Sequence, residues 1–371
     1  MRIAQLTLNA YFNYGNILQK FALHHTLKKF TDSTEVICPA DSRFFPETGV
    51  KRYAQCVLKP ERKNNREYMD AFYRREAIRQ NKFKDFENLY IDTRFDFPYF
   101  EDIADEYDFF VVGSDQVWNP KWNPPYIFLE FVPREKKISY AASIGAPEIP
   151  NNKKELFKRG ISDFNYLSVR EDDAVRIIKE LTGRSSVVVL DPVLLLSKEE
   201  WLAVSQKPTW FKEKYRNGFV LTYYLGKLPP PEVKTLAVEL GLPVINLLDV
   251  ENFNHFTVGP AEFVWLFAHA SLVFTNSFHG MAFSLLFKRP FINREIENDK
   301  AREGMSNRMV TVLKLFGLMD RRPSAEKTFT VKEAMTIDFS RCDEVLPIER
   351  AKAFNFLAGA LSGAPELGIR S

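Results

Sequence analysis

Short apolar segments that alternate with helical segments constrain this fold more than any other feature of the sequence. In the first half of the chain, residues 2–8 alternate between polar and apolar, and apolar segments of strand length recur at 108–112, 137–142, 166–169 and 187–190. Most connections between them are long or have helical periodicity. Apolar strands joined by crossovers are typical of a parallel sheet that is covered by helices on both faces. The first half therefore predicts an α/β domain.

A second alternation of strands and helices begins after Asp191 and Pro192. Ser197 and Glu200 have the spacing of a capping box, which predicts that a helix starts there. Further strands are expected over 219–224, 243–248, 272–275 and 291–293, with helices over 231–240, 260–270 and 281–287. We expect an N-terminal domain over 1–196, a C-terminal domain over 197–345, and a helix in 346–371 that packs back on the N-terminal domain.

The composition fits two domains of a cytoplasmic protein. The chain has 371 residues, of which 45% are hydrophobic and 27% charged, and this exceeds what one compact core normally buries. No apolar run approaches the roughly 20 residues that span a bilayer, and the first residues lack the apolar region of a signal peptide. Three scattered cysteines, Cys38, Cys56 and Cys342, predict free thiols rather than disulfides or a zinc site.

One segment is strongly basic. Residues 51–84 hold eleven Lys or Arg against four Asp or Glu, and aromatic residues are interleaved with these charges. We place them in a helical insertion over about 45–95. Two interpretations stay open: an arm that lies on an anionic surface such as a membrane, and a solvated insertion whose aromatics face the core. No nucleic-acid module is recognisable, so no nucleic-acid partner is expected.

Ser277-Phe278-His279-Gly280 places a histidine between an apolar strand and the helix that follows. Free N–H groups and the helix dipole at such a turn favour an anion, such as a phosphate or a carboxylate. A histidine in this position suits acid or base catalysis. The alternative is that His279 merely caps the helix or packs.

Polar residues also follow the predicted strands of the first domain. In parallel sheets ligands bind outside the carboxyl ends of the strands, so these residues are expected to converge on one site. They are Ser114 and Asp115, Ser143, Arg170, and Asp191.

The loop after residue 112 offers side chains that bind sugars. Asp115 and Gln116 supply a carboxylate and an amide, and Trp118 supplies an aromatic face. An Asp that caps a helix beside a packed Trp is the alternative. The planar forks of Arg170 and Arg308 suit phosphate or carboxylate, although structural ion pairs explain such arginines equally well.

Several signatures of other enzymes are missing. The chain has no GxGxxG motif and no P-loop, which argues against classical dinucleotide binding and NTP hydrolysis. It has no DxD motif, and its five histidines form no i,i+4 pair, so we predict no metal and no cofactor.

Six blocks of the sequence resemble the polysaccharide pyruvyl transferase family, in order and in wording. They are NYGNILQKFAL, VVGSDQVWNP, ISYAASIG, LSVREDDAV, VVLDPVLLL and ASLVFTNSFHGMAFSLLFKRPFI, within about residues 13–321. The resemblance implies two Rossmann-like domains in a glycosyltransferase-B-like arrangement with a cleft between them. It also implies transfer of pyruvate from phosphoenolpyruvate to a galactose- or mannose-type sugar of a surface polysaccharide precursor, as a cyclic ketal.

This resemblance gives the candidate residues their expected roles. His279, Arg170 and Asp115 are the expected catalytic residues. Substrate contacts are expected from Asn13, Gly15, Ser114, Gln116, Trp118, Ser143, Asn276, Ser277, Gly280 and Arg308. The expected partners are phosphoenolpyruvate and a lipid-linked or nucleotide-linked acceptor, with peripheral contact at the inner face of the membrane left open. The alternatives are a nucleotide-sugar-dependent glycosyltransferase and a non-catalytic glycan-binding or assembly protein.

Overall fold

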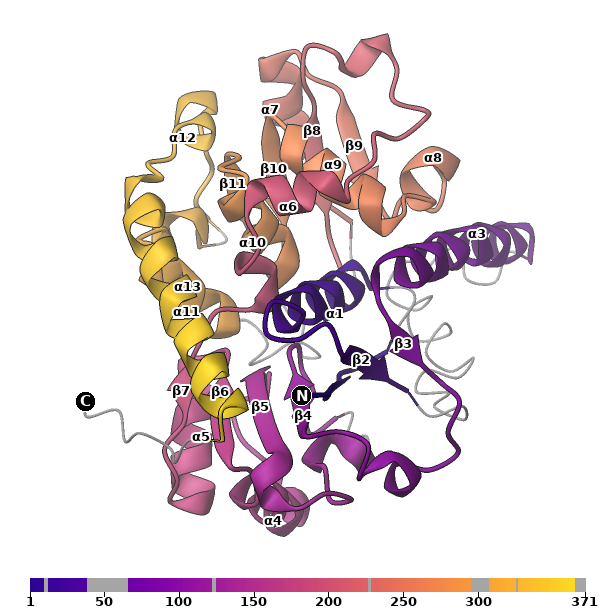
Figure 1. Cartoon of the computed structure of the whole chain (residues 1–371). Helices are drawn as coiled ribbons and strands as arrows, with labels where there is room; N and C mark the ends of the chain where they lie inside the picture. Colours follow the sequence, from indigo (N-terminus) through magenta and orange to yellow (C-terminus); the bar gives the residue numbers. More distant parts are fainter. Residues whose placement is uncertain are drawn as a thin grey trace.

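Two parallel β-sheets with surrounding helices form the molecule (Figure 1). The computed structural model describes residues 1–9, 13–38, 66–121, 125–225, 228–294, 307–324 and 326–363. Within them a seven-stranded sheet has the order β3-β2-β1-β4-β5-β6-β7, and a four-stranded sheet has the order β11-β10-β8-β9. Every neighbouring pair of strands is parallel. The predicted α/β class with two Rossmann-like sheets is confirmed.

The first sheet contains the predicted strands and two that were missed. Its strands are β1 (Ile3–Leu6), β2 (Thr34–Ile37), β3 (Thr93–Arg94), β4 (Phe109–Gly113), β5 (Lys137–Ala142), β6 (Tyr166–Val169) and β7 (Val187–Val188). Its helices are α1 (Tyr14–Leu27), α3 (Arg66–Tyr90), α4 (Lys154–Ser162) and α5 (Asp172–Thr182). Strands β2 and β3 were not predicted, because the first two residues of β2 (Thr34 and Glu35) and both residues of β3 are polar, so neither strand is an apolar run.

The second sheet follows the predicted order of strands and helices. Its strands are β8 (Val220–Tyr223), β9 (Val244–Leu247), β10 (Leu272–Thr275) and β11 (Phe291–Asn293). The helices are α6 (Lys198–Ala203), α7 (Glu232–Leu240), α8 (Phe253–Phe256), α9 (Pro260–His269), α10 (Phe278–Leu286), α11 (Asn307–Leu315), α12 (Val331–Met335) and α13 (Ser340–Leu361). Helix α10 begins three residues earlier than predicted, because Ser277 is its N-cap.

Short 3-10 helices connect these elements. They are η2 (Phe100–Ile103), η3 (Pro125–Phe128), η4 (Arg134–Lys136), η5 (Asn151–Lys153), η6 (Pro192–Leu194), η7 (Glu213–Tyr215) and η9 (Met319–Arg321). Among them, η6 lies directly after the last strand of the first sheet and contacts both α1 and α10.

The strand orders set where a ligand can bind. In the first sheet the chain reverses its direction of growth between β1 and β4, and in the second sheet between β8 and β10. Ligands of open α/β sheets bind at the carboxyl ends of the strands at such switch points. Asp115 follows β4 and His279 follows β10, so each sheet brings a predicted site residue to its own switch point.

One hydrophobic core joins the two sheets. Successive side chains of a strand point to opposite faces, so Ala4 packs in a core on the far side of the first sheet while Ile3 packs in the central core. The central core continues through α1 and α10 to Leu221 and Val273 of the second sheet. Both sheets contribute to this core, so the core does not mark where one domain ends and the next begins. The domain boundary predicted at residue 196 stays a prediction.

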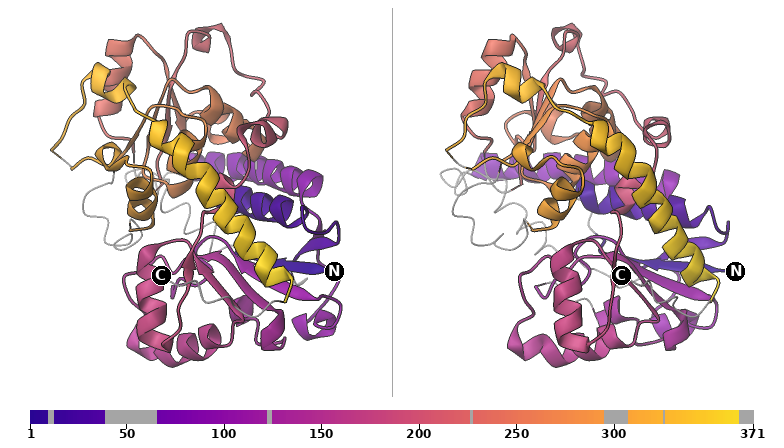
Figure 2. Two further views of the ribbon diagram at one scale, coloured as in Figure 1. Left: turned by 60° about the vertical axis from the view of Figure 1, so that its left-hand side comes forward. Right: turned by 90° about the vertical axis from the view of Figure 1, so that its left-hand side faces the viewer.

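Helix α13 crosses from the second sheet to the first (Figures 1 and 2). The ring of Phe356 lies 6.4 Å from that of Tyr140 in β5, and Phe354 lies 6.3 Å from Phe30. Arg350 donates hydrogen bonds to the carbonyl oxygens of Leu194 and Leu196, in the segment that connects the two sheets. The helix therefore fastens both sheets to their connection.

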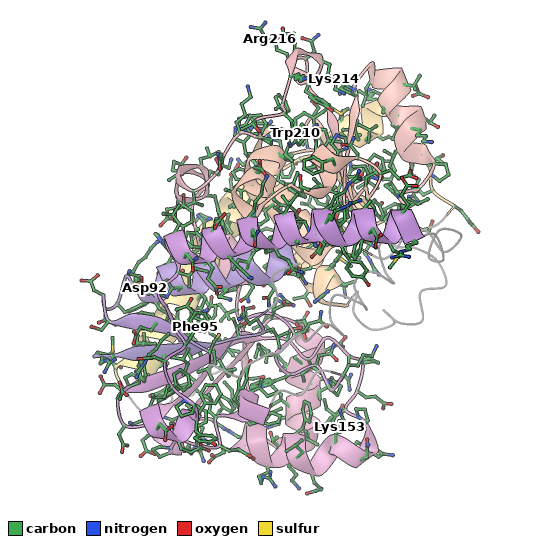
Figure 3. The ribbon with its side chains drawn as sticks, turned by 90° about the vertical axis from the view of Figure 1, so that its right-hand side faces the viewer. Asp92, Phe95, Lys153, Trp210, Lys214 and Arg216 are labelled. Atoms are coloured by element: carbon green, nitrogen blue, oxygen red, sulfur yellow. The ribbon has the colours of Figure 1, made fainter. Side chains whose placement is uncertain are left out.

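Helix α3, the described part of the predicted basic insertion, packs across the junction of the two sheets (Figure 3). Arg79 is buried and lies over the rings of Tyr14 in α1 and Phe256 in α8, at 5.4 and 5.3 Å. Arg75 donates to the carbonyl oxygen of Val250. Arg79 therefore serves packing rather than a lipid surface, and the interpretation of the basic segment as an arm on an anionic surface stays a prediction.

The structure describes only part of the basic segment. Residues 45–65 of the predicted insertion lie outside the described residues. No helix in the described part of the chain has both the length and the apolar character needed to cross a membrane.

Candidate functional site

Asp191 lies at the centre of a buried polar cluster that both sheets build. It follows the first sheet, and its Oδ1 accepts a hydrogen bond of 3.0 Å from the amide of Val193, so it caps η6. Its Oδ2 accepts from Arg170 Nη1 at 2.6 Å and from Ser114 Oγ at 3.3 Å. Burial alone would raise the pKa of the Asp191 carboxyl, but the interactions with His279 and Arg170 outweigh it and hold that pKa well below its usual range.

Arg170 is completely buried at the carboxyl end of β6. Burial opposes its charge, but Asp191, Asp115 and Glu171 outweigh this and raise the pKa of the guanidinium. Its Nη1 binds Asp191, whereas Nε and Nη2 have no hydrogen-bond partner. The guanidinium carbon lies 4.4 Å from the centre of the Phe278 ring, which belongs to the second sheet. Two buried donors are therefore left to bind a ligand.

His279 reaches the cluster from the other sheet. It lies in the first turn of α10, where the hydroxyl oxygen of Ser277 accepts from the amide of Gly280 at 3.4 Å. The imidazole Nε2 is 3.7 Å from Asp191 Oδ2 and has no hydrogen-bond partner. The structure thus brings together the predicted His279 and Arg170, both beside Oδ2 of Asp191.

Gly15 makes room for this histidine. It lies in the first turn of α1, and a Cβ added to it would come within 1.9 Å of His279 Nδ1. Any side chain at this position would overlap the imidazole. Gly15, predicted as a substrate contact, therefore has a steric role in the structure.

Asp115 lies between two arginines. Its Oδ1 is 3.6 Å from Arg170 Nη2 and 4.0 Å from Arg308 Nη1, and Asn16 Nδ2 donates to its Oδ2 at 3.5 Å. Arg308 belongs to α11 and also faces the Phe278 ring, at 5.8 Å. Both arginines therefore flank the same carboxylate and the same ring.

A sequence comparison decides the family. A family model described as "Polysaccharide pyruvyl transferase" matches residues 13–297. The chain belongs to the polysaccharide pyruvyl transferase family. It is an enzyme of polysaccharide pyruvylation, and the family implies a sugar acceptor. A comparison with curated proteins finds no match.

This pyruvyl transferase is also similar to solved structures, at low identity. Over 98% of the chain it matches all of the UDP-GlcNAc 2-epimerase from Neisseria meningitidis bound to UDP-GlcNAc, at 11% identity with a TM-score of 0.44. The same coverages hold for Alr3699/HepE from Anabaena in complex with UDP and glucose, at 10% identity with a TM-score of 0.48. The ADP-heptose LPS heptosyltransferase II of E. coli matches over 95% of this chain and 99% of its own, at 13% and 0.35.

Three residues predicted to bind substrate in the pyruvyl transferase are fully buried instead. Trp118 packs against Phe164 in the far core of the first sheet, so the prediction of a sugar-binding face is wrong. The hydroxyl of Ser114 donates to the carbonyl of Ala141 at 2.9 Å, besides its bond to Asp191. That of Ser143 donates to Glu171 Oε1 at 3.0 Å. The hydroxyl groups of both serines therefore form hydrogen bonds within the protein that stabilise the site.

The remaining predicted contacts shape the backbone around the site. Asn276 binds the backbone of Leu225 through both amide atoms, at 2.8 and 3.0 Å, so its amide is occupied. Asn13 caps α1 and accepts from the amide of Gly15 at 3.0 Å, and Ser277 caps α10. Gly280 lies against Thr275, whose hydroxyl a Cβ would approach to 2.4 Å.

Gln116 is the one predicted contact of the loop that stays half-buried. Its Oε1 accepts from Asn119 Nδ2 at 2.6 Å.

Sequence reasoning missed two members of the cluster. Asp191 was expected among the strand-end residues that converge on one site, but no role was predicted for it. Phe278 and Glu171 were missed because their roles depend on partners that are distant in sequence. Glu171 Oε1 also accepts from the backbone of Ile144 and Gly145, at 2.9 and 3.2 Å.

Among the residues that the structure describes, no group of three His, Cys, Asp or Glu side chains could hold a metal ion. The arrangement brings together two arginines, a histidine and three carboxylates, which are groups suited to proton transfer and anion binding.

Proposed function

We propose that the donor is phosphoenolpyruvate and that the acceptor is a galactose- or mannose-type sugar of a surface polysaccharide precursor, which receives the pyruvyl group as a cyclic ketal. The observation that carries the proposal is Arg170, whose Nε and Nη2 are buried without hydrogen-bond partners. A buried donor without a partner is costly unless a ligand completes it. A planar guanidinium suits a carboxylate or a phosphate in particular.

Phosphoenolpyruvate carries both of these anionic groups, so it needs more than one cation. Arg308 faces the same ring as Arg170 and supplies the second guanidinium. Three carboxylates, those of Asp115, Asp191 and Glu171, already surround Arg170 within 3.9 Å. These carboxylates already balance the positive charge of Arg170. Binding of the negatively charged donor therefore depends strongly on Arg308.

The acceptor supplies two hydroxyl groups. The oxygen of the first bonds to C2 of phosphoenolpyruvate, while its proton leaves and C3 gains a proton. The oxygen of the second then bonds to C2, and the C2–O bond to phosphate breaks, so that inorganic phosphate leaves with the bonding electrons. Both steps need proton transfer, for which His279 and Asp115 are the proposed groups.

A thermal-shift titration tests the donor. A ligand that binds only the folded state raises the melting temperature. We expect phosphoenolpyruvate to stabilise the wild type and to lose this effect in Arg308→Ala. Arg308 is preferred to Arg170 for this test because removal of Arg170 would leave Asp191 buried without its counter-ion.

Arg176→Ala is the matched control, because Arg176 is exposed and its partners are Asp173, Glu180 and the carbonyl oxygen of Pro147, away from the site. It should respond to phosphoenolpyruvate as the wild type does. UDP and GDP are titrated beside it. Stabilisation by a nucleoside diphosphate and not by phosphoenolpyruvate would overturn the proposal in favour of glycosyl transfer.

A further inference from the structure

The two ring nitrogens of His279 have different surroundings. Nε2 is buried and faces the carboxylate of Asp191 at 3.7 Å, whereas Nδ1 lies over the bare Cα of Gly15. In the neutral imidazole one nitrogen carries the proton and the other accepts, and the partner of one nitrogen sets the state of the other.

Asp191 is well suited to set that state. Its side chain is fixed by the amide of Val193 and by Arg170, and it comes from the first sheet, while His279 comes from the second. It presents only acceptor oxygens, so the imidazole nitrogen that faces it is best protonated. No other carboxylate among the described residues lies within 4.0 Å of the His279 imidazole.

We infer that Asp191 is a positioning residue that holds His279 as the Nε2–H tautomer, and that Nδ1, which lies beside the Cα of Gly15, is the reactive nitrogen. The inference rests on the proposed function for its substrate. Nδ1 takes the proton of the first sugar hydroxyl as the oxygen bonds to C2, and returns this proton to C3. In the second step Nδ1 takes the proton of the second hydroxyl, while the C2–O bond to phosphate breaks.

The tautomer can be measured without substrate. In protein labelled with ¹⁵N-histidine, two-bond correlations between ring protons and ring nitrogens distinguish protonated from unprotonated nitrogens. Five histidines give a simple spectrum, and the signal missing from His279→Gln assigns His279. At pH 9, above the usual titration range of histidine, we expect a protonated Nε2 and an unprotonated Nδ1. A protonated Nδ1 in the wild type would overturn the inference.

Asp191→Asn tests the cause of the preference. A carboxamide cannot accept from Arg170, Ser114 and Val193 together, since one of its two atoms donates, and it carries no negative charge toward His279. We expect the Nε2–H fraction of His279 to fall, and an unchanged fraction would show that Asp191 does not set the tautomer. Because this measurement contains no substrate, its outcome does not depend on which donor the enzyme uses.

Gly15→Ala tests the reactive nitrogen. We expect kcat to fall about 100-fold, the cost of displacing a catalytic group by about 1 Å. The stabilisation by phosphoenolpyruvate should remain, because Arg170 and Arg308 are untouched. Gly359→Ala in α13 is the control, since a Cβ there meets nothing within 4 Å. Wild-type kcat in Gly15→Ala would contradict a reactive Nδ1 at this position.

Discussion

At the scale of single residues, the Asp191 cluster decides how the protein responds to acid. The folded-state pKa of Asp191 lies below its unfolded value because His279 and Arg170 outweigh the effect of burial. The ionised carboxylate therefore contributes stability that is present above about pH 4 and is lost as the pH falls through the folded-state pKa. We expect Asp191→Asn to lower the free energy of unfolding by about 3 kcal/mol at pH 7, and by less below about pH 4.

Urea denaturation of the wild type and the variant between pH 7 and pH 3 checks this prediction. Glu180→Gln is the control, because the pair of Glu180 with Arg176 is exposed and should contribute less than about 1 kcal/mol at any pH. A difference between wild type and Asp191→Asn that stays constant over this range would contradict the role assigned to the Asp191 charge.

At the scale of elements, α3 contains arginines with opposite roles. Arg79 is buried, and Glu76 accepts its Nε–H at 3.0 Å, whereas Arg74 is exposed on the same helix. Arg79→Ala leaves Glu76 buried without its partner, so we expect a loss of about 3–5 kcal/mol in the free energy of unfolding. Arg74→Ala should change it by less than about 0.5 kcal/mol. Equal losses in urea denaturation would show that α3 does not pack as described.

The sequence predicted most elements because their patterns are local. Strands β4, β5 and β6 are mostly apolar segments, and the end of each is followed by a polar residue that the parallel sheet brings to the same edge. The direction of a loop side chain depends on contacts that are distant in the sequence. Trp118 was therefore predicted to bind a sugar, whereas it packs in the far core of the first sheet. Likewise, the pairing of Asp191 with His279 joins two sheets, and no spacing along the chain reveals it.

At the scale of the whole molecule, the shared core predicts that both sheets unfold together. Trp118 lies in the far core of the first sheet, and Trp265 lies in α9 of the second half. Two variants are compared, one with Trp118 and one with Trp265 as its only tryptophan. Their fluorescence should change at the same urea concentration, because coincident transitions are the mark of two-state unfolding. Two separate midpoints would show that the central core and α13 do not couple the sheets.

The fit of His279 against Gly15 has a consequence for recombining relatives of this enzyme. A chimera of two relatives would join the first half of one chain to the second half of the other. Here the helix that leaves room for the histidine comes from residues 14–27, and the histidine itself from residues 278–286. If only one of these two segments were exchanged, surfaces that do not fit would meet where Gly15 contacts His279. Both segments must therefore come from the same parent protein.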